Sequence, residues 1–430
     1  MDPAAKGPDC GLEPGSWQKG AARVTTTTTL VHRARHGSLE WWRKALVYEI
    51  ASPELGAQDL SGLHGVLDHV RSIGFNTVLL RPSLVDVPDQ LPAVTAFAAA
   101  AHERGLHLLL RVSGALGPVT GPHAGEDHRI VVGRERADEG LLARAEAFLS
   151  AGADGVDLGT IIPPEVDEAT DLDRLTEYFH RLHGLVATYT DEGVIGADVS
   201  ADYPETWRHH FQEDWLHHLR DDTLMLVRWN ADSMTRHLTR SLDQHDRFGA
   251  PPVWRFLPSH ALGSSTDPGD GRRWFTQPEV REQRAQALQA LLLALPGSVY
   301  LRQGDEVALP DALKPFSSLE THELVNEHAA AQGALFGSPL ATVRHAARLR
   351  QERRLASAPL AFVTGIDWCA PGVFTMLVRN VLVLVNVTSE PVRLPEHAEV
   401  LLSSHVLAQG DGAILVPPTT TVWLDAATVA

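Results

Sequence analysis

The sequence of 430 residues predicts a (β/α)8 barrel followed by a C-terminal all-β sandwich. From Trp41 onward, short apolar runs alternate with segments whose apolar residues recur at helical spacing. This alternation is typical of a parallel sheet that is buried on both faces and closes into a barrel. After about Leu355, β-rich runs separated by proline and glycine replace the alternation, which predicts a sandwich of strands.

The elements follow in order along the chain. Residues 1–38 contain glycine, proline and a threonine run with little apolar periodicity, so we expect a disordered N-terminal tail there. The barrel is predicted over 39–355, and its first helix closes at Gly74. The sandwich is predicted over 356–430. The expected barrel strands are K-A-L-V-Y-E-I, F-N-T-V-L-L-R-P, L-H-L-L-L-R-V, A-D-G-V-D-L-G, E-G-V-I-G-A-D-V, L-M-L-V-R-W, V-W-R-F-L and G-S-V-Y-L-R.

Composition and charge narrow the function classes. The formal net charge is −17 and the basic residues form no long block, which argues against nucleic acid and anionic membranes as partners. Cys10 and Cys369 lie at opposite ends of the chain and form neither a disulfide framework nor a metal-binding motif. Because no secretory signal and no membrane-spanning run is evident, we expect a cytoplasmic protein. We also expect neither a cofactor nor a metal ion.

The segments W-W-R-K-A-L-V-Y-E-I, G-A-D-G-V-D-L-G and L-P-G-S-V-Y-L-R-Q-G-D-E-V-A-L-P resemble segments of the α-amylase superfamily, glycoside hydrolase family 13. The segments D-D-T-L-M-L-V-R-W-N-A-D-S and F-G-A-P-P-V-W-R-F-L are similar to those of its bacterial α-glucosidase branch. The resemblance covers Trp41 to Leu424. It implies a retaining hydrolase fold whose activity depends on four short regions at the C-terminal ends of barrel strands.

The first region of active relatives ends a strand with aspartate and places Asn and His four and five residues later. In G-L-H-L-L-L-R-V-S-G-A-L these positions are Arg111, Ala115 and Leu116. The second region carries an arginine and, two residues on, the nucleophilic aspartate. Asp157 falls on the arginine position and Gly159 on the nucleophile. Both regions therefore lack the groups that the family uses.

The third region supplies the acid/base glutamate. In V-I-G-A-D-V-S-A-D-Y-P-E, Ala197 falls on that position, and the downstream Asp202 keeps the ungapped register. A shift of one residue would make Asp198 the candidate, but alternation would then turn its side chain to the other face of the strand.

The fourth region of active relatives is an Asn-His-Asp triplet. R-F-L-P-S-H-A-L gives Ser259, His260 and Ala261 with one inserted residue, or Pro258, Ser259 and His260 without it. Neither register contains the aspartate. The domain that the family inserts after the third strand is reduced to about G-P-V-T-G-P-H-A-G-E-D-H.

Two charges are exchanged relative to the family pattern. Arg111 stands at an aspartate position and Asp157 at an arginine position. The resemblance implies that these positions lie on neighbouring strands and face the same site. We hypothesise that they form a reversed ion pair, because an unpaired charge at the barrel mouth would be unfavourable. The alternative is two independently solvated side chains. Arg111, Asp157, Asp198 and His260 are the candidates for residues of a residual cleft.

The histidines of W-R-H-H-F-Q-E-D-W-L-H-H-L raise the question of a metal site. The sets His209, Glu213, His217 and His210, Asp214, His218 are each spaced to share one helix face. Because the sequence offers no further ligand, we favour a solvated helix face with charge pairs.

The pattern predicts a catalytically inactive homologue of α-amylases and α-glucosidases. Gly159, Ala197 and Ala261 stand at the positions where the family has its three catalytic carboxylates. Its expected role is binding or scaffolding linked to carbohydrate metabolism, with a carbohydrate or another protein as partner. One alternative is an active hydrolase or transglycosidase that uses relocated carboxylates such as Asp157, Asp198 or Glu165. Another is a protein that binds and senses a sugar.

Overall fold

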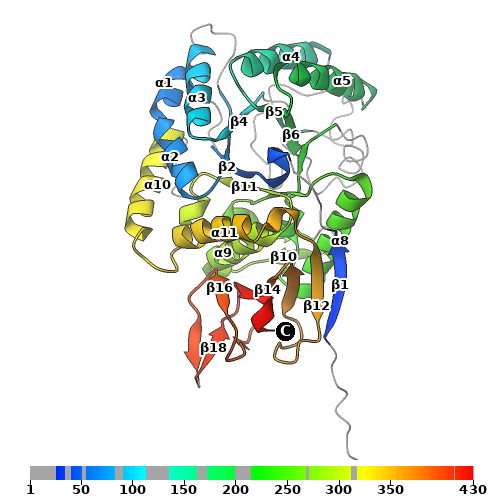
Figure 1. The fold of residues 1–430 in the computed structure, drawn as a ribbon, viewed down its shortest axis with the longest axis vertical. Coiled ribbons are helices and arrows are strands. Elements are labelled where there is room, and N and C mark those ends of the chain that lie inside the picture. Colours follow the sequence, from blue (N-terminus) through cyan, green and yellow to red (C-terminus); the bar gives the residue numbers. More distant parts are fainter. Residues whose placement is uncertain are drawn as a thin grey trace, which may run out of the picture.

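The structure is a computed structural model that describes ten stretches of the chain. A barrel forms the larger part, and a β-domain lies at one end of it (Figure 1). The described residues are 26–33, 40–50, 55–82, 91–112, 135–161, 172–198, 215–267, 271–310, 317–410 and 412–429.

Eight parallel strands form the barrel in the order β7-β6-β5-β4-β3-β2-β11-β8. A bridge between Asp221 and Trp254 links β7 to β8 and closes the sheet. The predicted (β/α)8 barrel is therefore confirmed. The strands are β2 (Leu46–Glu49), β3 (Thr77–Leu80), β4 (His107–Arg111), β5 (Gly155–Thr160), β6 (Val194–Asp198), β7 (His218–Arg220), β8 (Val253–Arg255) and β11 (Ser298–Arg302).

The sixth barrel strand differs from the prediction. We expected it in L-M-L-V-R-W, but the first three residues of that run lie in the short helix α7 (Thr223–Leu226), and the strand is H-L-R at β7. A short apolar run fits a buried helical turn as well as a strand. Here Leu224, Met225 and Leu226 are all buried in the main core.

Helices surround the barrel strands (Figure 1). Asn230 begins α8, where its side chain accepts a hydrogen bond of 2.8 Å from the Ser233 amide. Gly249 ends α8 in the left-handed conformation, with φ of 73°. The helices besides α7 are α1 (Ala57–Gly62), α2 (His64–Ser72), α3 (Leu91–Glu103), α4 (Glu135–Ser150), α5 (Leu172–Tyr189), α8 (Ala231–Phe248), α9 (Pro278–Ala294), α10 (Ser318–Gln332) and α11 (Pro339–Glu352).

Alternation along each barrel strand separates two sets of side chains. One set packs outward with the helices in the main core. The other set meets on the barrel axis, where Val47, Leu79, Leu109, Val194, Val253 and Tyr300 form a separate apolar cluster. Because successive residues point to opposite faces, the position two residues beyond each of these also points inward.

The C-terminal strands form two packed sheets, which confirms the predicted β-sandwich. The larger sheet has the order β1-β12-β13-β14-β19-β16, and the smaller one β15-β18-β17. Leu382 and Leu384 of β14 belong to the cluster that includes residues of both sheets, whereas Val383 belongs to the main core. The strands are β12 (Leu360–Thr364), β13 (Phe374–Val378), β14 (Val381–Asn386), β15 (Val392–Arg393), β16 (Val400–Ser403), β17 (Ala408–Gly410), β18 (Ala413–Val416) and β19 (Thr420–Asp425).

The segment β1 (Thr27–His32) corrects the expectation of a disordered tail through residue 38. These six residues pair antiparallel with β12. β-branched threonine and valine suit a strand, and the edge of an existing sheet supplies the pairing partner that no local pattern reveals. The His32 side chain contacts Asp246 of α8 at 2.8 Å. Residues 1–25 and 34–38 of the expected tail lie outside the described residues.

Arg350 of α11 caps the C-terminal end of α9. Its guanidinium donates hydrogen bonds to the carbonyls of Leu293, at 2.9 Å, Leu295 and Gly297. Burial lowers the pKa of Arg350 to about 9. The last carbonyls of a helix have no partner within the helix, so this one side chain satisfies groups that would otherwise be buried without hydrogen bonds.

We expect Arg350→Met to lower the free energy of unfolding by about 3 kcal/mol, because it leaves several buried carbonyls unsatisfied. Chemical denaturation would measure this change. Arg348→Met on the same helix is the control, since the Arg348 side chain is 64% exposed. Equal stability of the two variants would contradict the role given to Arg350.

Candidate functional site

Charged side chains occupy the inner surface of the barrel at the C-terminal ends of its strands. Six strands each place one of them there, at the mouth where barrel enzymes bind substrate. They are Glu49 on β2, Arg111 on β4, Asp157 on β5, Asp198 on β6, Arg220 on β7 and Arg255 on β8.

The first half of the arrangement joins β2, β4 and β5. Arg111 Nε donates to Asp157 Oδ1 at 2.7 Å, and Arg111 Nη2 donates to Glu49 Oε1 at 3.0 Å. Arg111 and Asp157 are also register partners on adjacent strands. The reversed ion pair that the sequence predicted is thereby confirmed, and Arg111 also bonds to Glu49.

The second half joins β5 to β8 and returns to β2. Arg220 donates to both Asp157 Oδ2 and Asp198 Oδ1. Arg255 Nη1 donates to Asp198 Oδ2 at 2.7 Å, and its Nη2 lies 3.3 Å from Glu49 Oε1. The six side chains therefore form a closed ring in which acids and arginines alternate. We call it the mouth ring.

The mouth ring is buried, and its formal charges cancel. Side-chain exposure runs from 0% for Asp157 to 11% for Arg111. Burial alone would raise the pKa of Asp157, but the charges of Arg220 and Arg111 outweigh it and hold that pKa well below its ordinary value. Asp157 is therefore ionised at neutral pH, with both of its oxygens bonded to guanidinium groups.

A polar chain continues from the mouth ring down the barrel axis. The Arg220 guanidinium lies 5.0 Å from the centre of the Tyr300 ring. Tyr300 Oη is 2.6 Å from His218 Nδ1, and His218 Nε2 is 2.7 Å from the Trp42 carbonyl. Because that carbonyl only accepts, Nε2 carries the proton and Nδ1 accepts from the Tyr300 hydroxyl. Burial lowers the pKa of His218 to about 3, so the ring is neutral.

Two glycines give the mouth ring its space. A Cβ added to Gly196 would lie 2.9 Å from Asp157 Oδ2, so a side chain there would displace the carboxylate. Gly159 has φ of 68°, a left-handed conformation that favours glycine, and its amide donates to Asp157 Oδ1 at 3.0 Å. At the position that the family resemblance assigns to the nucleophile, the chain therefore supplies a backbone amide to the ring.

The third region requires a correction. We expected alternation to turn Asp198 away from the face that carries the site, but Asp198 bonds to Arg220 and Arg255 inside the barrel. Ala197 packs in the outer core. Val194 begins the strand on the inner face, so even-numbered residues of β6 point inward. The sequence alone could not decide whether Ala197 or Asp198 points inward, because no residue of the third region fixes its alignment to the family motif.

The fourth region lies at the rim and outside the mouth ring. His260 is exposed on the short helix η2 (Ser259–Gly263), and Ala261 packs against the main core. Of the residual-cleft candidates, the structure therefore brings Arg111, Asp157 and Asp198 together and leaves His260 apart.

The Q-G-D-E segment forms a separate network beside β2. Glu306, within η3 (Asp305–Val307), accepts from the Tyr48 hydroxyl at 2.8 Å and from the Gly304 amide at 2.9 Å. His69 Nε2 lies 2.8 Å from the same carboxylate. Glu306 is fully buried and bonds to none of the mouth-ring arginines that the structure describes. These contacts hold Tyr48 of β2 in place, and the Glu306 carboxylate is used in hydrogen bonds within the protein.

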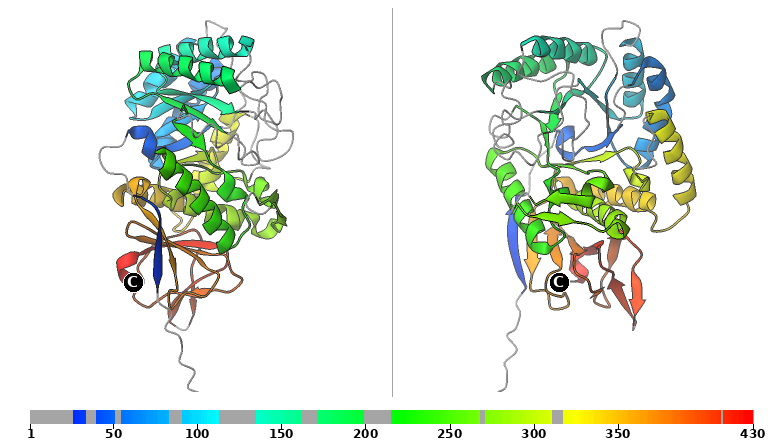
Figure 2. Two further views of the ribbon diagram at one scale, coloured as in Figure 1. Left: turned by 90° about the vertical axis from the view of Figure 1, so that its right-hand side faces the viewer. Right: turned by 180° about the vertical axis from the view of Figure 1, so that it is seen from behind.

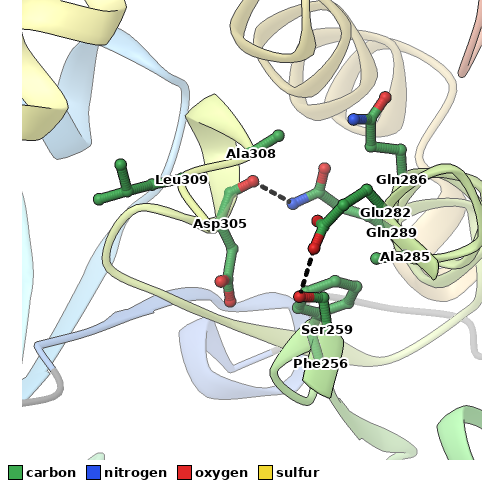
Figure 3. A pocket seen from close by; sticks show the side chains of 9 residues that line it. All are labelled: Phe256, Ser259, Glu282, Ala285, Gln286, Gln289, Asp305, Ala308 and Leu309. Carbon is green, nitrogen blue, oxygen red and sulfur yellow. Dashed lines mark hydrogen bonds between the residues drawn. The ribbon is translucent and has the colours of Figure 1, made fainter. Parts of the chain in front are cut away.

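A shallow hollow lies at the rim between β8 and α9 (Figure 3). Its volume is about 300 Å³, including space open to solvent. Phe256 lines it, and Ser259 Oγ donates to Glu282 Oε1 at 2.8 Å across it. The hollow contains no member of the mouth ring.

The histidine-rich segment is only partly described. His209, His210, Glu213 and Asp214 lie outside the described residues, as do Glu165 and the reduced inserted domain. We expected His217 and His218 on a solvated helix, each with its own set of residues, but His218 begins β7 and His217 precedes it. Among the described residues, no group of three or more His, Cys, Asp or Glu side chains is arranged to hold a metal ion.

Sequence reasoning missed half of the mouth ring, namely Glu49, Arg220 and Arg255. A signal for them was present, because the apolar runs L-V-Y-E, H-L-R and V-W-R each end in a charged residue. Strands that run parallel in a barrel bring their C-terminal residues to the same end. Counting such charges around all strands would have predicted a group of opposite charges.

No protein-family model matches this chain, and no curated protein sequence matches it. The fold is similar to that of the type III pullulan hydrolase from Thermococcus kodakarensis, with a TM-score of 0.55 and 17% identity over 90% of this chain and 83% of that one. An α-amylase from Lactobacillus plantarum gives 0.55 and 12%, over 88% and 98%. Cyclic α-maltosyl-(1→6)-maltose hydrolase from Arthrobacter globiformis gives 0.51 and 14%, over 90% and 99%.

These structures show that the chain has an α-amylase-type fold, as the sequence resemblance implied. At such low identities the likeness concerns the fold alone. None of the described helices is long and apolar enough to cross a membrane.

We expect Asp157→Asn to lower the free energy of unfolding by about 3–5 kcal/mol, because Arg220 and Arg111 would keep their buried charges with one carboxylate fewer. Denaturant titration would measure the loss. Asp243→Asn on α8 is the control, since Asp243 is exposed. A change of less than about 1 kcal/mol in both variants would contradict a stabilising mouth ring.

Acid should destabilise the barrel through its buried histidines. Burial lowers the pKa of His217 to about 4, below the value of about 6.5 in an unfolded chain. Between these two pH values the unfolded state binds the proton and the folded state does not, so stability falls by about 1.4 kcal/mol per pH unit for this group. His217→Asn should reduce the pH slope of the unfolding free energy by that amount between about pH 6 and 4.5. Equal slopes would contradict the prediction.

Proposed function

We propose that this chain is a catalytically inactive relative of the α-amylase-type hydrolases, with a binding or scaffolding role linked to carbohydrate metabolism. The observation that carries the proposal is the mouth ring. Its carboxylates lie at the C-terminal mouth of the barrel, where barrel enzymes bind substrate, and each one is bonded to two arginines.

The chemistry of retaining hydrolysis is the reason for this conclusion. It needs one carboxylate free to attack the anomeric carbon and a second one that is protonated and able to donate, about 5–5.5 Å apart. A general acid usually has a raised pKa, from burial or from a neighbouring negative charge. The guanidinium groups around Asp157 have the opposite effect on its pKa, and they also occupy the oxygens that would react.

The rival proposal is an active hydrolase that uses relocated carboxylates. Asp157 and Asp198 would have to break several buried ion pairs before either reached a sugar. Glu165 lies outside the described residues, so geometry gives it no support. The mouth ring therefore favours the inactive reading over this rival.

The role that remains for an inactive barrel is recognition of a sugar or of another protein. The similar structures include hydrolases of pullulan and of a cyclic maltosyl-maltose, which makes α-glucosides the first ligands to test for sugar sensing. A cytoplasmic location, and the exclusion of nucleic acid and membranes as partners, stay predictions from the sequence.

One panel of measurements tests the proposal. Purified protein at high concentration is incubated with maltose, trehalose and sucrose, glucose release is assayed, and melting temperatures are recorded with each sugar. We expect no glucose release. A rise in melting temperature without turnover would favour a sugar-binding role, and no rise would favour a protein scaffold.

Hydrolysis that is lost in Asp157→Asn or Asp198→Asn, but kept in Glu282→Gln, would overturn the proposal. Glu282 is an exposed carboxylate at the rim, outside the mouth ring, and serves as the matched control. Far-UV circular dichroism of each variant would distinguish loss of activity from loss of fold.

A further inference from the structure

A short hairpin of two strands, β9 (Ser264–Thr266) and β10 (Arg273–Phe275), joins three parts of the chain. Figure 2 shows this light-green part of the chain in the half of the barrel nearer the β-domain. Trp274 Nε1 donates to a carbonyl of α7 at 2.6 Å. An arginine of α9 donates to the hydroxyl of Thr276, just after β10, at 2.8 Å. The hairpin therefore contacts both the end of α7 and the start of α9.

The arginine of α9, Arg284, is a buried cation that the described residues provide with no acidic partner. Only 4% of the residue is exposed. Its Nη1 donates to Thr276 Oγ1 at 2.8 Å and its Nη2 to the Val227 carbonyl at 2.7 Å, and both acceptors are neutral. The ring centres of Trp274 and Trp229 lie 4.2 and 5.0 Å from its Cζ. Burial lowers the pKa of Arg284 to about 9, whereas buried charges in proteins are usually paired with an opposite charge.

Two further arginines lie against the same hairpin. A Cβ added to Gly263 would lie 3.0 Å from Arg281 Nη2, so the glycine leaves room for that guanidinium at the base of the hairpin. Arg281 forms no ion pair with any acid that the structure describes, and its buried Nε has no acceptor there. Arg228 Nη2 lies 3.5 Å from the Arg273 carbonyl of β10, and the Arg228 Nε is likewise buried without an acceptor among the described residues.

Four buried N–H donors at this hairpin thus lack an acceptor within the described part of the chain. They are Nε of Arg228, Arg281 and Arg284, and Nε1 of Trp229. Native proteins leave few buried donors unsatisfied, and water molecules would accept from them without balancing three positive charges. The neighbouring acids Asp267 and Glu282 accept from serine hydroxyls at 3.0 and 2.8 Å, and neither forms an ion pair with these arginines. The missing acceptor should therefore be an anion.

We propose that these four side chains form a binding site for a phosphate group, which we call the hairpin site. A phosphate group carries about two negative charges and at least three acceptor oxygens, whereas a carboxylate has one charge and two oxygens. Three guanidiniums and an indole therefore match phosphate better, and arginine is well suited to bidentate contacts with it.

The exposure of the side chains supports access of a ligand. Arg228, Trp229 and Arg281 are partly exposed, whereas the buried Arg284 adds its charge. Because no hydrogen bond to a described residue holds the Arg281 guanidinium, it can turn towards an anion without breaking a contact. The hairpin site shares no residue with the mouth ring, so it stands independently of the proposed inactivity of the barrel.

Isothermal titration calorimetry of the full chain with inorganic phosphate tests the proposal. In Tris buffer at neutral pH we expect saturable binding with a dissociation constant of about 1 mM. Sodium chloride at equal ionic strength should not reproduce the binding heat, because screening alone is not selective for phosphate. Glucose 6-phosphate is the second titrant. Tighter binding of this ester would identify a phosphorylated sugar as the ligand, and binding that is no tighter would identify free phosphate.

Arg281→Gln and Arg228→Gln should each raise the dissociation constant at least about tenfold, because each removes hydrogen bonds to a charged ligand. Melting temperatures without phosphate should change little, since neither guanidinium forms an ion pair with a described acid. Arg344→Gln removes the same charge from an exposed position on α11 and is the matched control, which should bind like the parent. Arg284 is left unchanged, because its substitution would also disturb the packing of two tryptophans.

The indole of Trp229 gives a direct readout of the site. Its Nε1–H resonance, identified by its loss in Trp229→Phe, should shift in NMR spectra as phosphate is added, because the indole gains an acceptor.

Three results would overturn the proposal. The first is the absence of saturable binding of either phosphate compound up to about 20 mM. The second is a chloride titration that gives the same heats as phosphate, which would mean general screening. The third is phosphate binding that both glutamine variants leave intact or that leaves the Trp229 resonance in place, which would locate the site elsewhere.

Discussion

Six charged side chains stay buried at the mouth of this barrel because each one bonds to two neighbours of opposite charge. A single buried ion pair rarely stabilises a fold, since removing both charges from water is unfavourable. In the mouth ring each carboxylate accepts from two guanidiniums, so the loss of hydration is offset from both sides. Removing any one member would leave its neighbours with a buried excess of charge.

Much of the barrel interior is adapted to this ring. Gly196 leaves room for the Asp157 carboxylate, and the Gly159 amide donates to it. Below the ring, Tyr300 and His218 continue the hydrogen bonds along the axis towards Trp42. A chain of hydrogen bonds therefore crosses an interior in which Val47, Leu79 and Val253 form part of an apolar cluster.

The ring is also the physical basis of the proposal that this barrel is inactive. An active site holds charged groups in incomplete hydrogen bonding, so that substrate can complete it. Here the arginines complete it in advance. Restoring one family residue, for example an aspartate in place of Gly159, would add a negative charge near Arg111 without freeing either of the existing aspartates. Inactivity would thus be a property of the whole ring, beyond the loss of single residues.

The sequence by itself determined the barrel and the sandwich, because the periodicity of strands and helices is a local property. The family resemblance then placed Arg111 and Asp157 on neighbouring strands. The sequence could not place Asp198 on the inner face, since a shift of one residue reverses the direction of every side chain in a strand. Nor could it join Glu49, Arg220 and Arg255 to the pair, or pair β1 with β12. Those contacts link residues far apart in the chain, and only closure of the barrel and docking of the β-domain bring them together.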